Sequence, residues 1–386
     1  MKEGEEIEVG AGPGEIEVDS EAILDSPKPF QCGQCGAELT FAPGLHSLRC
    51  SYCGHENPIP QSEADIHELD FHAYLADAGS RQETQETLTL KCEACGAEST
   101  AAANITAQKC PFCDMTINAT ASSRKTIKPK SLLPFKVPAQ DAKRKYRDWI
   151  GGLWFAPGEL KHRAKAEVGI TGIYVPFWTY DAHTVSFYTG QRGTHYYVTE
   201  TRSVRNAQGK MVSSRVQVRK TRWSFKAGRV WNNFNDVLVP ASRSMPEGLS
   251  RSLEPWDLAN LAPYRDEYLS GFKAESYQVD LETGFHSAKQ IMDEAIRASI
   301  SRDIGGDEQR ILTAKTQHDK VTFKHILLPV WLSAYRYKSK VYRFMVNART
   351  GEVQGERPWS RPKIAAAVAV AVAAGIAVLN LLKDFQ

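Results

Sequence analysis

The feature that most constrains this chain is the spacing of its eight cysteines. They form two groups with one shared pattern, a C-x2-C pair, fourteen further residues and a second C-x2-C pair. The groups are Cys32, Cys35, Cys50 and Cys53, and then Cys92, Cys95, Cys110 and Cys113. A tetrahedral zinc site needs two thiolate pairs on two facing turns, and this spacing supplies them. Four disulfides are the alternative, but the repeated spacing favours two zinc ribbons.

The two cysteine groups are also an internal repeat. They are offset by sixty residues, and the letters CGAE at 35–38 recur at 95–98. We therefore predict one ribbon over residues 29–60, a second over 87–121, and two structural Zn2+ ions as cofactors. Four thiolates complete the coordination of zinc, so neither site keeps a position at which water could be activated. His46, beside the first group, is accordingly expected at the surface, as is His55.

The N-terminal segment differs in composition from the rest of the chain. Residues 1–28 contain nine Asp or Glu, two Lys and no aromatic residue. Such a segment cannot bury enough apolar surface to fold, so a disordered acidic tail is expected. No apolar stretch typical of a signal peptide is visible in it. Thiols arranged for metal then predict a reducing compartment for the ribbons.

The opposite end is apolar. Residues 364–382 form a run of nineteen without a charge. As a helix this run would be about 28 Å long, close to the hydrocarbon thickness of a bilayer. Basic residues precede it, so the positive-inside rule predicts a single C-terminal span in the inner (cytoplasmic) membrane, with the bulk of the chain in the cytoplasm. Residues 357–386 would then be a basic juxtamembrane segment and a transmembrane helix. An alanine-rich buried helix is the alternative.

The remaining sequence divides into a connecting segment and one larger domain. Residues 61–86 are predicted to form a helix and a polar linker, and the helix would start at a capping box made by Ser62 and Asp65. Residues 122–356 are predicted to form a mixed α+β domain. The fold class is therefore α+β, with tandem small zinc ribbons, then this domain with an antiparallel meander, then one C-terminal transmembrane helix.

Within that domain, periodicity indicates helices over 141–150 and 287–301. The segment 194–238 alternates between apolar and polar residues in short runs. It is expected to form a β-meander with a turn at 206–209, where the letters are NAQG.

Two apolar fragments of the domain look related. IYVPFWTYDA at 173–182 and ILLPVWLSAY at 326–335 both place Pro two residues before Trp. A degenerate β-α-β duplication would explain the likeness, and two unrelated edge strands are the alternative. Because proline lacks the N–H that a central strand donates, both strands are expected at an edge or a bulge. Trp178 and Trp331 are expected in the core.

The chain contains none of the common catalytic signatures. It has no P-loop, no nucleophile elbow, no H-E-x-x-H and no dinucleotide-binding glycine pattern. The segment 201–235 is instead the best candidate for a functional surface, because nine Lys or Arg and no acidic residue alternate there with aromatic residues. Its proposed site residues are Arg215, Arg219, Arg222 and Arg229. Such a surface could bind anionic lipid, an anionic protein or nucleic acid, or it could be a solvated meander.

Longer phrases of the sequence resemble a bacterial family of membrane-anchored double zinc-ribbon proteins. They are the paired ribbons, TRWSFKAGRVWNNFNDVLVPAS at 221–242, LEPWDLANLAPYRDEYLSGFKAE at 253–275 and LLPVWLSAYRYKSKVYRFMVNARTGEVQGERPWS at 327–360. Members are often labelled TFIIB-type zinc ribbon-containing protein, or primosomal protein N′ (replication factor Y), superfamily II helicase. The helicase label disagrees with the missing Walker motifs. The resemblance implies an adaptor that works with flotillin-like SPFH-domain proteins, and it implies no catalytic residue.

These observations together predict a non-enzymatic, membrane-anchored cytoplasmic adaptor that recruits protein partners through its tandem zinc ribbons. The alternative is a nucleic-acid-binding zinc-ribbon protein that uses the ribbons and the basic segment. An enzyme of unfamiliar type within the α+β domain is a third hypothesis. A homo-oligomer is compatible with each of them.

Overall fold

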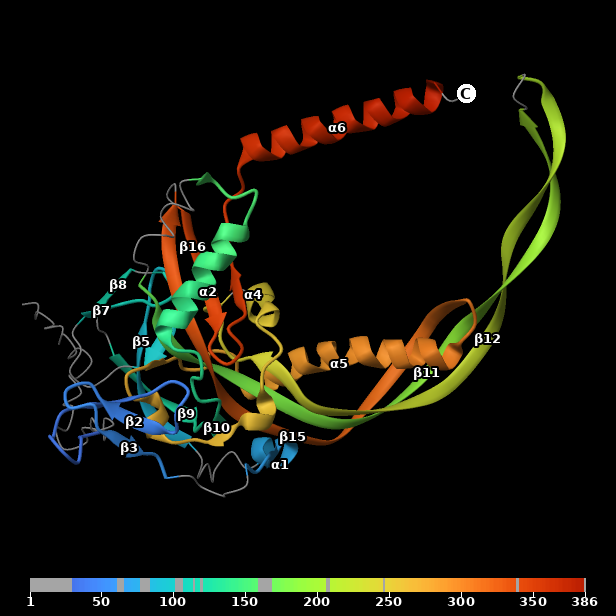
Figure 1. The fold of residues 1–386 in the computed structure, drawn as a ribbon. Coiled ribbons are helices and arrows are strands. Elements are labelled where there is room, and N and C mark those ends of the chain that lie inside the picture. The colour runs from blue at the N-terminus through green and yellow to red at the C-terminus, as the bar shows by residue number, and fades with distance from the viewer. Residues whose placement is uncertain are drawn as a thin grey trace, which may run out of the picture.

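The computed structural model shows a mixed α+β fold, mostly antiparallel sheet, from which a long hairpin and a C-terminal helix project (Figure 1). It describes residues 30–60, 66–76, 84–100, 107–113, 115–118, 121–158, 169–205, 209–245, 247–337 and 340–384. The acidic segment 1–28 lies outside the described residues, as do Ser62 and Asp65.

A nine-stranded sheet forms the centre of the molecule. Its order is β12-β11-β15-β10-β13, and β4, β14, β16 and β17 pair off this path. The strands are β4 (Leu69–Asp70), β10 (Ser131–Leu132), β11 (Thr171–Arg205), β12 (Met211–Pro240), β13 (Ala262–Pro263), β14 (Lys273–Ala274), β15 (Glu308–Tyr337), β16 (Lys340–Asn347) and β17 (Val353–Gly355).

Smaller sheets belong to the cysteine-rich part of the chain. The first ribbon holds β1 (Leu39–Phe41), β2 (Ser47–Cys50) and β3 (Glu56–Pro58) in one antiparallel sheet. The second holds β5 (Thr84–Lys91), β6 (Glu98–Thr100) and β9 (Ala121–Ile127), with β7 (Ala107–Lys109) and β8 (Thr116–Asn118) paired separately.

The helices of the described residues are of unequal length. They are α1 (Phe71–Ala76), α2 (Ala139–Gly152), α4 (Glu247–Ser252), α5 (Leu281–Ile304) and α6 (Arg361–Asp384), with 3-10 turns η1 (Leu258–Asn260) and η2 (Asp266–Leu269). Both helices that periodicity indicated are present and longer than expected. The longer of them, α5, begins at Asp280, whose side chain accepts a hydrogen bond from the N–H of Thr283 at 2.8 Å.

The central sheet is covered on both faces. On one face Trp178 and Tyr180 pack with α5, while Tyr174 and Trp331 pack with α2 and the first ribbon. On the other face Val175 and its neighbours pack with the second ribbon and with residues 245–261. Trp178 and Trp331 are therefore core residues, as expected.

The helix α5 lies very close to the sheet, and a glycine makes this approach possible. A Cβ atom added to Gly284 would lie 2.8 Å from Cδ1 of Trp178, which is nearer than real Cβ contacts come. Any larger residue at this position would push α5 off β11.

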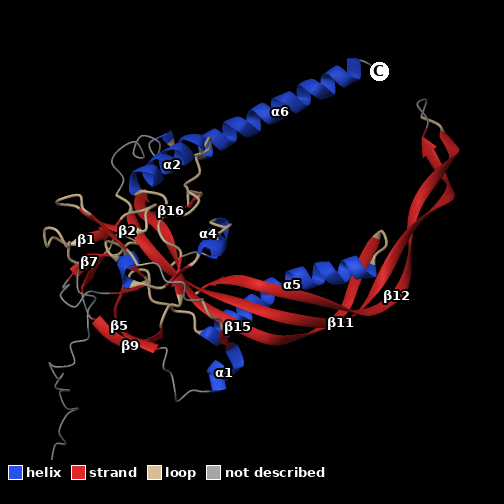
Figure 2. Cartoon of the chain, turned by 60° about the horizontal axis from the view of Figure 1, so that its bottom comes forward, coloured by secondary structure: helices blue, strands red, loops and turns tan. Residues whose placement is uncertain are grey.

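Instead of the several short strands expected over 194–238, the structure has one continuous hairpin. β11 and β12 pair from Phe177↔Pro240 to Arg205↔Met211, so the chain turns where the sequence indicated. β15 covers the β11 edge only as far as Gly193. Beyond it, Thr194–Arg205 and Met211–Arg222 form a bare two-stranded segment, here called the distal ribbon (Figure 2).

The expectation that both proline-containing strands lie at an edge is wrong. β11 and β15 are the two central strands, and they pair with each other through the related fragments, with Val175 opposite Leu328. β11 and β15 pair with each other along one edge. Each proline lies where the strand that pairs along the opposite edge changes. Along β11 the change at Pro176 is from β14 to β12, and along β15 the change at Pro329 is from β10 to β16. Because no strand pairs with the proline along that edge, its missing N–H removes no hydrogen bond from the sheet.

Two parts of the domain make matching contacts. The indole N–H of Trp178 donates to the carbonyl of Val279 at 2.9 Å, and that of Trp331 donates to the carbonyl of Val137 at 2.8 Å. Those carbonyls directly precede the N-caps of α5 and α2. In addition, β10 pairs in parallel with β15, just as β14 pairs in parallel with β11. One β-α-β unit is β10-α2-β11 and the other is β14-α5-β15. The short first strand of each unit therefore pairs with the long strand of the other unit.

The short helix after the first ribbon also differs from expectation. Residues 69 and 70, expected to be helical, form β4, in which Leu69 pairs with Phe323. The helix α1 starts only at Phe71, and the Asp70 carboxylate accepts a hydrogen bond from the N–H of Ala73 at 2.7 Å. The aspartate therefore caps α1 in the described structure.

Candidate metal centres

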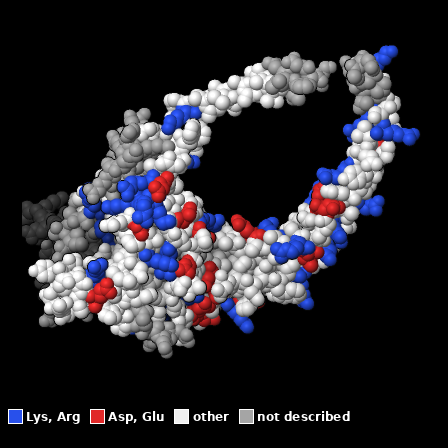
Figure 3. All heavy atoms as spheres, in the orientation of Figure 1, with Lys and Arg blue, Asp and Glu red and all other residues white. Residues whose placement is uncertain are grey.

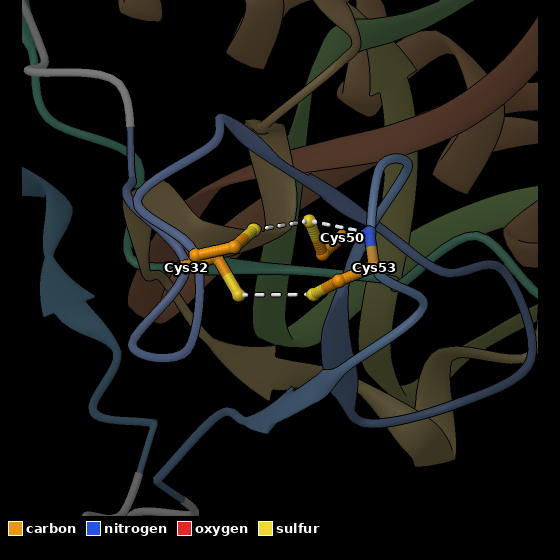
Figure 4. Close-up of side chains that lie close together, drawn as sticks. Cys32, Cys50 and Cys53 are labelled. Carbon is orange, nitrogen blue, oxygen red and sulfur yellow. Dashed lines mark hydrogen bonds between the residues drawn. The ribbon is translucent and has the colours of Figure 1, made fainter.

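The first four cysteines converge from two facing turns. Sγ of Cys32 lies 3.7 Å from Sγ of Cys53, and Sγ of Cys35 lies 3.5 Å from Sγ of Cys50. Figure 4 shows Cys32, Cys50 and Cys53 pointing toward one another. None of these pairs is a disulfide.

The second four cysteines repeat this arrangement. Sγ of Cys92 lies 3.5 Å from Sγ of Cys113, and Sγ of Cys95 lies 3.6 Å from Sγ of Cys110. Sulfur atoms bonded to one tetrahedral zinc at about 2.3 Å would be about 3.8 Å apart. Each cluster thus has the number, type and spacing of donors that a zinc ion requires, and the sequence identified all eight.

The backbone of each turn explains why C-x2-C forms these sites. The N–H of the first cysteine donates to the carbonyl five residues later in all four turns, as in Cys32→Ala37 at 2.8 Å and Cys92→Ala97 at 2.8 Å. After three of the four pairs the next residue is a glycine with a positive φ of 73° to 75° (Gly36, Gly54 and Gly96). That left-handed conformation closes the turn and suits glycine best.

In each cluster the surroundings lower the pKa of some thiols and raise the pKa of others. The backbone N–H of Cys53 lowers the pKa of Cys50 to about 6. In the second cluster the Cys110 thiol lowers the pKa of Cys95 to about 5. Burial raises the pKa of Cys113 to about 11, so metal binding, which requires thiolates, releases protons from such cysteines.

The first ribbon lies at the edge of the molecule. On its inner side it packs against the domain, where Phe41 and Leu48 belong to the same apolar cluster as Tyr174 of the sheet. The N–H of Phe41 donates to the carbonyl of Ser270 at 3.0 Å, and the hydroxyl of Ser270 donates to the carbonyl of Leu39 at 2.6 Å. Phe41 packs edge-on against Tyr268 with ring centroids 5.2 Å apart. The opposite side of the ribbon is open, and Tyr52, between Cys50 and Cys53, is 85 % exposed.

The second ribbon is part of the core. Phe112 occupies the position that Tyr52 has in the first ribbon, and it is 0 % exposed. It lies in one apolar cluster with Val175 and Leu328 of the central sheet. Arg343 of β16 donates from Nε to the Phe112 carbonyl at 3.0 Å, which fixes the turn against the sheet.

A buried carboxyl group lies along the contact between the second ribbon and the sheet. Glu275 forms a β-bridge with Ser99, and its Oε1 accepts hydrogen bonds from the hydroxyls of Ser242, at 2.8 Å, and Ser244. Burial raises the pKa of Glu275 to about 8, against the effect of these hydroxyl donors. The carboxyl group is therefore mostly protonated at neutral pH.

Three carboxylates that the sequence did not single out meet elsewhere, from Glu68, Asp181 and Asp236. Their centre is taken by the ammonium group of Lys324, whose Nζ lies 2.8 Å from Oε1 of Glu68 and 2.7 Å from Oδ1 of Asp236. The lysine side chain is nearly buried. This cluster is an ion-pair network that ties β4, β12 and β15 together, and its carboxylates already have a cation.

The histidines beside the first cluster are not ligands. His55 and His46 are both exposed, as expected. Nδ1 of His46 lies 3.4 Å from the hydroxyl of Tyr268. His46 therefore contributes to the contact between the ribbon and the domain.

The four arginines proposed from the sequence all lie on β12, and the structure does not bring them to one point. Arg215 and Arg219 occur on one face of the distal ribbon, since residues two or four apart share a face. Arg222 lies on the other face, 5.3 Å from the ring of Tyr196, and Arg229 lies 4.8 Å from the ring of Trp231 nearer the base. They form an extended basic surface and not a pocket.

The apolar C-terminal run forms the helix α6. Its window Arg361–Val378 is long and apolar enough to cross a membrane, and none of it is buried. The Lys363 ammonium group donates to the carbonyl of Ala156 at 2.7 Å, and the Ser360 N–H donates to the carbonyl of Phe155 at 2.8 Å. These contacts fix only the start of the helix.

Two exposed tryptophans lie at the base of α6, and the sequence analysis singled out neither of them. Trp359 is 55 % exposed beside Phe155, with Arg357 stacked on its ring at 4.5 Å. Trp154 is 75 % exposed at the same place, although it lies some two hundred residues earlier in the chain. Tryptophan with arginine or lysine at a helix end is typical of a membrane interface.

No family model and no solved structure matches this chain. A protein of Bacillus subtilis (strain 168), the uncharacterized protein YdjG, is 27 % identical over 340 residues, which make up 87 % of this chain and 92 % of that protein. The likeness therefore extends over most of the chain.

Proposed function

We propose that this chain is a non-enzymatic adaptor, anchored in the inner membrane by α6, which recruits protein partners through its zinc-bound ribbons. Zinc would hold each ribbon in shape and carry out no chemistry, because four thiolates leave no open position. The observation that carries the proposal is α6, which projects from the domain with none of its apolar window buried. An exposed apolar helix of this length needs a bilayer around it.

The base of the helix supports the same assignment. Trp154 and Trp359 would lie at the headgroup level, while Arg357, Arg361 and Lys363 would remain on the cytoplasmic side. The domain and both ribbons would then face the cytoplasm.

The first ribbon is the better candidate for the partner site. Its turn exposes Tyr52, an amphipathic ring on a rigid metal-bound loop, whereas the matching Phe112 is buried in the protein's own core. Tyrosine is among the residues that contribute most to protein interfaces. The resemblance suggests a flotillin-like SPFH-domain protein as the partner.

The anchor is tested by carbonate extraction of membranes. The full chain should stay in the membrane fraction, and a chain that ends at Ser360 should be released. Equal solubility of the two would remove the anchor from the proposal.

The partner site is tested by co-purification of an SPFH-domain protein with the full chain. Tyr52→Ala should lower its recovery at least tenfold, the effect of a loss of about 2 kcal/mol at an interface hot spot. Leu312→Ala is the control, because Leu312 is also a large exposed residue, at 56 %, and lies outside both ribbons. An unchanged recovery with Tyr52→Ala would refute the first ribbon as the contact.

A further inference from the structure

The hairpin of β11 and β12 has a charge opposite to that of the rest of the chain. Its residues 186–235, here called the arm, contain ten Lys or Arg and one acidic residue, Glu200, a net charge of +9. The whole chain has a net charge of +3, which leaves −6 for everything else. Figure 3 shows the basic side chains spread along the arm. The arm is therefore suited to an anionic partner.

Few of these cations are neutralised within the arm. Glu200 is shared by Lys220, at 2.8 Å, and Arg202, at 3.2 Å. Arg215, Arg219 and Lys226 are exposed and form no ion pair among the described residues of the arm. In the distal ribbon no third strand covers either edge in the described part of the chain, so cations on both of its faces are accessible.

Exposed aromatic rings lie among the cations. Tyr197, Phe225 and Trp231 are all more than half exposed. Arg229 lies over the ring of Trp231, and Arg310 of the adjacent β15 lies 3.8 Å from the ring of Trp223. Aromatic rings beside Arg and Lys form a surface that can enter the headgroup region of a bilayer while the charges meet lipid phosphates.

The position of the arm favours a bilayer over other polyanions. α6 and the arm extend to the same side of the body (Figures 1 and 2). Contacts to Phe155 and Ala156 fix α6 only at its start, and the rest of its described window is exposed, so its direction can follow the membrane. A membrane that holds α6 is consequently within reach of the arm, and each Lys or Arg near an anionic leaflet strengthens binding about fivefold.

We propose that the arm binds the anionic lipid surface of the membrane that holds α6. The inference rests on the membrane anchor of the proposed function. The arm would lie along the cytoplasmic leaflet as a second contact, which restrains the domain and the first ribbon relative to the bilayer. No pocket is required, because the recognition is by charge and by interfacial aromatic rings.

Hydrogen exchange of the full chain in lipid nanodiscs tests the proposal. In discs that contain anionic phosphatidylglycerol, amides in 194–222 should exchange about tenfold more slowly than in discs of neutral phosphatidylcholine. Salt at about 0.5 M should abolish the difference. A variant that combines Arg215→Gln, Arg219→Gln and Lys226→Gln should lose most of this protection. Its amides in 194–222 should exchange in anionic discs at nearly the rate seen in neutral discs. Combined Arg49→Gln, Lys91→Gln and Arg243→Gln, three exposed cations outside the arm, should leave it unchanged.

The same particles separate failure of this inference from failure of the anchor. Protection of amides in 364–382 reports whether α6 is inserted, in either lipid. Inserted α6 with equal exchange of the arm in both lipids would overturn the inference and leave the anchor intact. A second test adds a short DNA duplex to neutral discs at the same phosphate concentration as the anionic lipid. If the duplex protects the arm more strongly than anionic discs do, the arm binds nucleic acid and the lipid inference is overturned.

Discussion

The two cysteine clusters share one spacing but occupy different environments. The first lies in a ribbon at the edge, where Tyr52 is open to solvent, and the second lies in a ribbon that closes one face of the central sheet, where Phe112 is fully buried. The ligand geometry is the same because it depends on local turns. The role of each site differs because it depends on what the turn packs against. We therefore expect metal loss to have local effects in the first ribbon and global effects in the second.

Removal of one ligand from each cluster should give the largest difference. Cys110→Ser should lose one zinc and destabilise the whole domain, because a structural zinc contributes on the order of 10 kcal/mol to folding and this ribbon is part of the core. Cys50→Ser should also lose one zinc, yet leave the domain folded. Metal analysis and thermal unfolding measure the two effects.

Wild-type protein should contain two zinc ions per chain and each variant one. Equal losses of thermal stability in both variants would contradict the difference between the ribbons. A well-folded wild type with almost no bound metal would contradict the zinc assignment itself.

Substitution of the matching aromatic residues should have the next largest effect. Phe112→Ala should lower the free energy of unfolding by about 3–5 kcal/mol, because it opens a cavity in the core. Tyr52→Ala should change it by less than about 0.5 kcal/mol, because an exposed ring makes few packing contacts that the substitution could remove. Urea unfolding of the full chain in detergent measures both. A similar loss for both variants would show that the exposed turn is also structural.

The pH dependence of stability should show a smaller difference between the ribbons, because the buried Glu275 lies at the contact of the second ribbon with the sheet. The pKa of Glu275 is raised to about 8, so its contribution is complete below pH 4.5 and is lost as pH rises toward 8. From this group alone, stability at pH 7 should be about 2–3 kcal/mol lower than at pH 5. Glu275→Gln should remove that part of the slope, because the amide oxygen still accepts from Ser242 and Ser244.

The measurement is urea unfolding at several pH values with zinc in excess, which limits metal loss at low pH. Glu56→Gln, an exposed carboxylate of the first ribbon, is the control and should retain the wild-type slope. A slope that is unchanged in Glu275→Gln would mean that the carboxyl group is ionised in the folded protein.

The parts of the molecule that depend on local chemistry could be predicted from the sequence. The eight ligands follow from spacing and turn geometry, and α2 and α5 follow from helical periodicity. The apolar run of α6 follows from composition.

The parts that depend on distant contacts could not be predicted in this way. The alternation in 194–238 indicates strands but not their length, because only pairing with β11 joins the runs into one β12. Pro176 indicates a gap in a ladder, but the gap occurs inside the sheet because β14 and β12 both end there. The burial of Phe112, and its contrast with Tyr52, is decided by residues 60 to 230 positions away, such as Val175 and Arg343.

The exchange of short strands between the two β-α-β units has a consequence during synthesis. β10 is made early, but its parallel partner β15 begins only at Glu308. When β10, α2 and β11 have emerged from the ribosome, the nascent chain still lacks β15, the strand that pairs with β11 and covers its apolar residues. Until β15 is made, this apolar surface needs protection, for example from a chaperone, and α6 follows β15 in the chain by only about twenty residues.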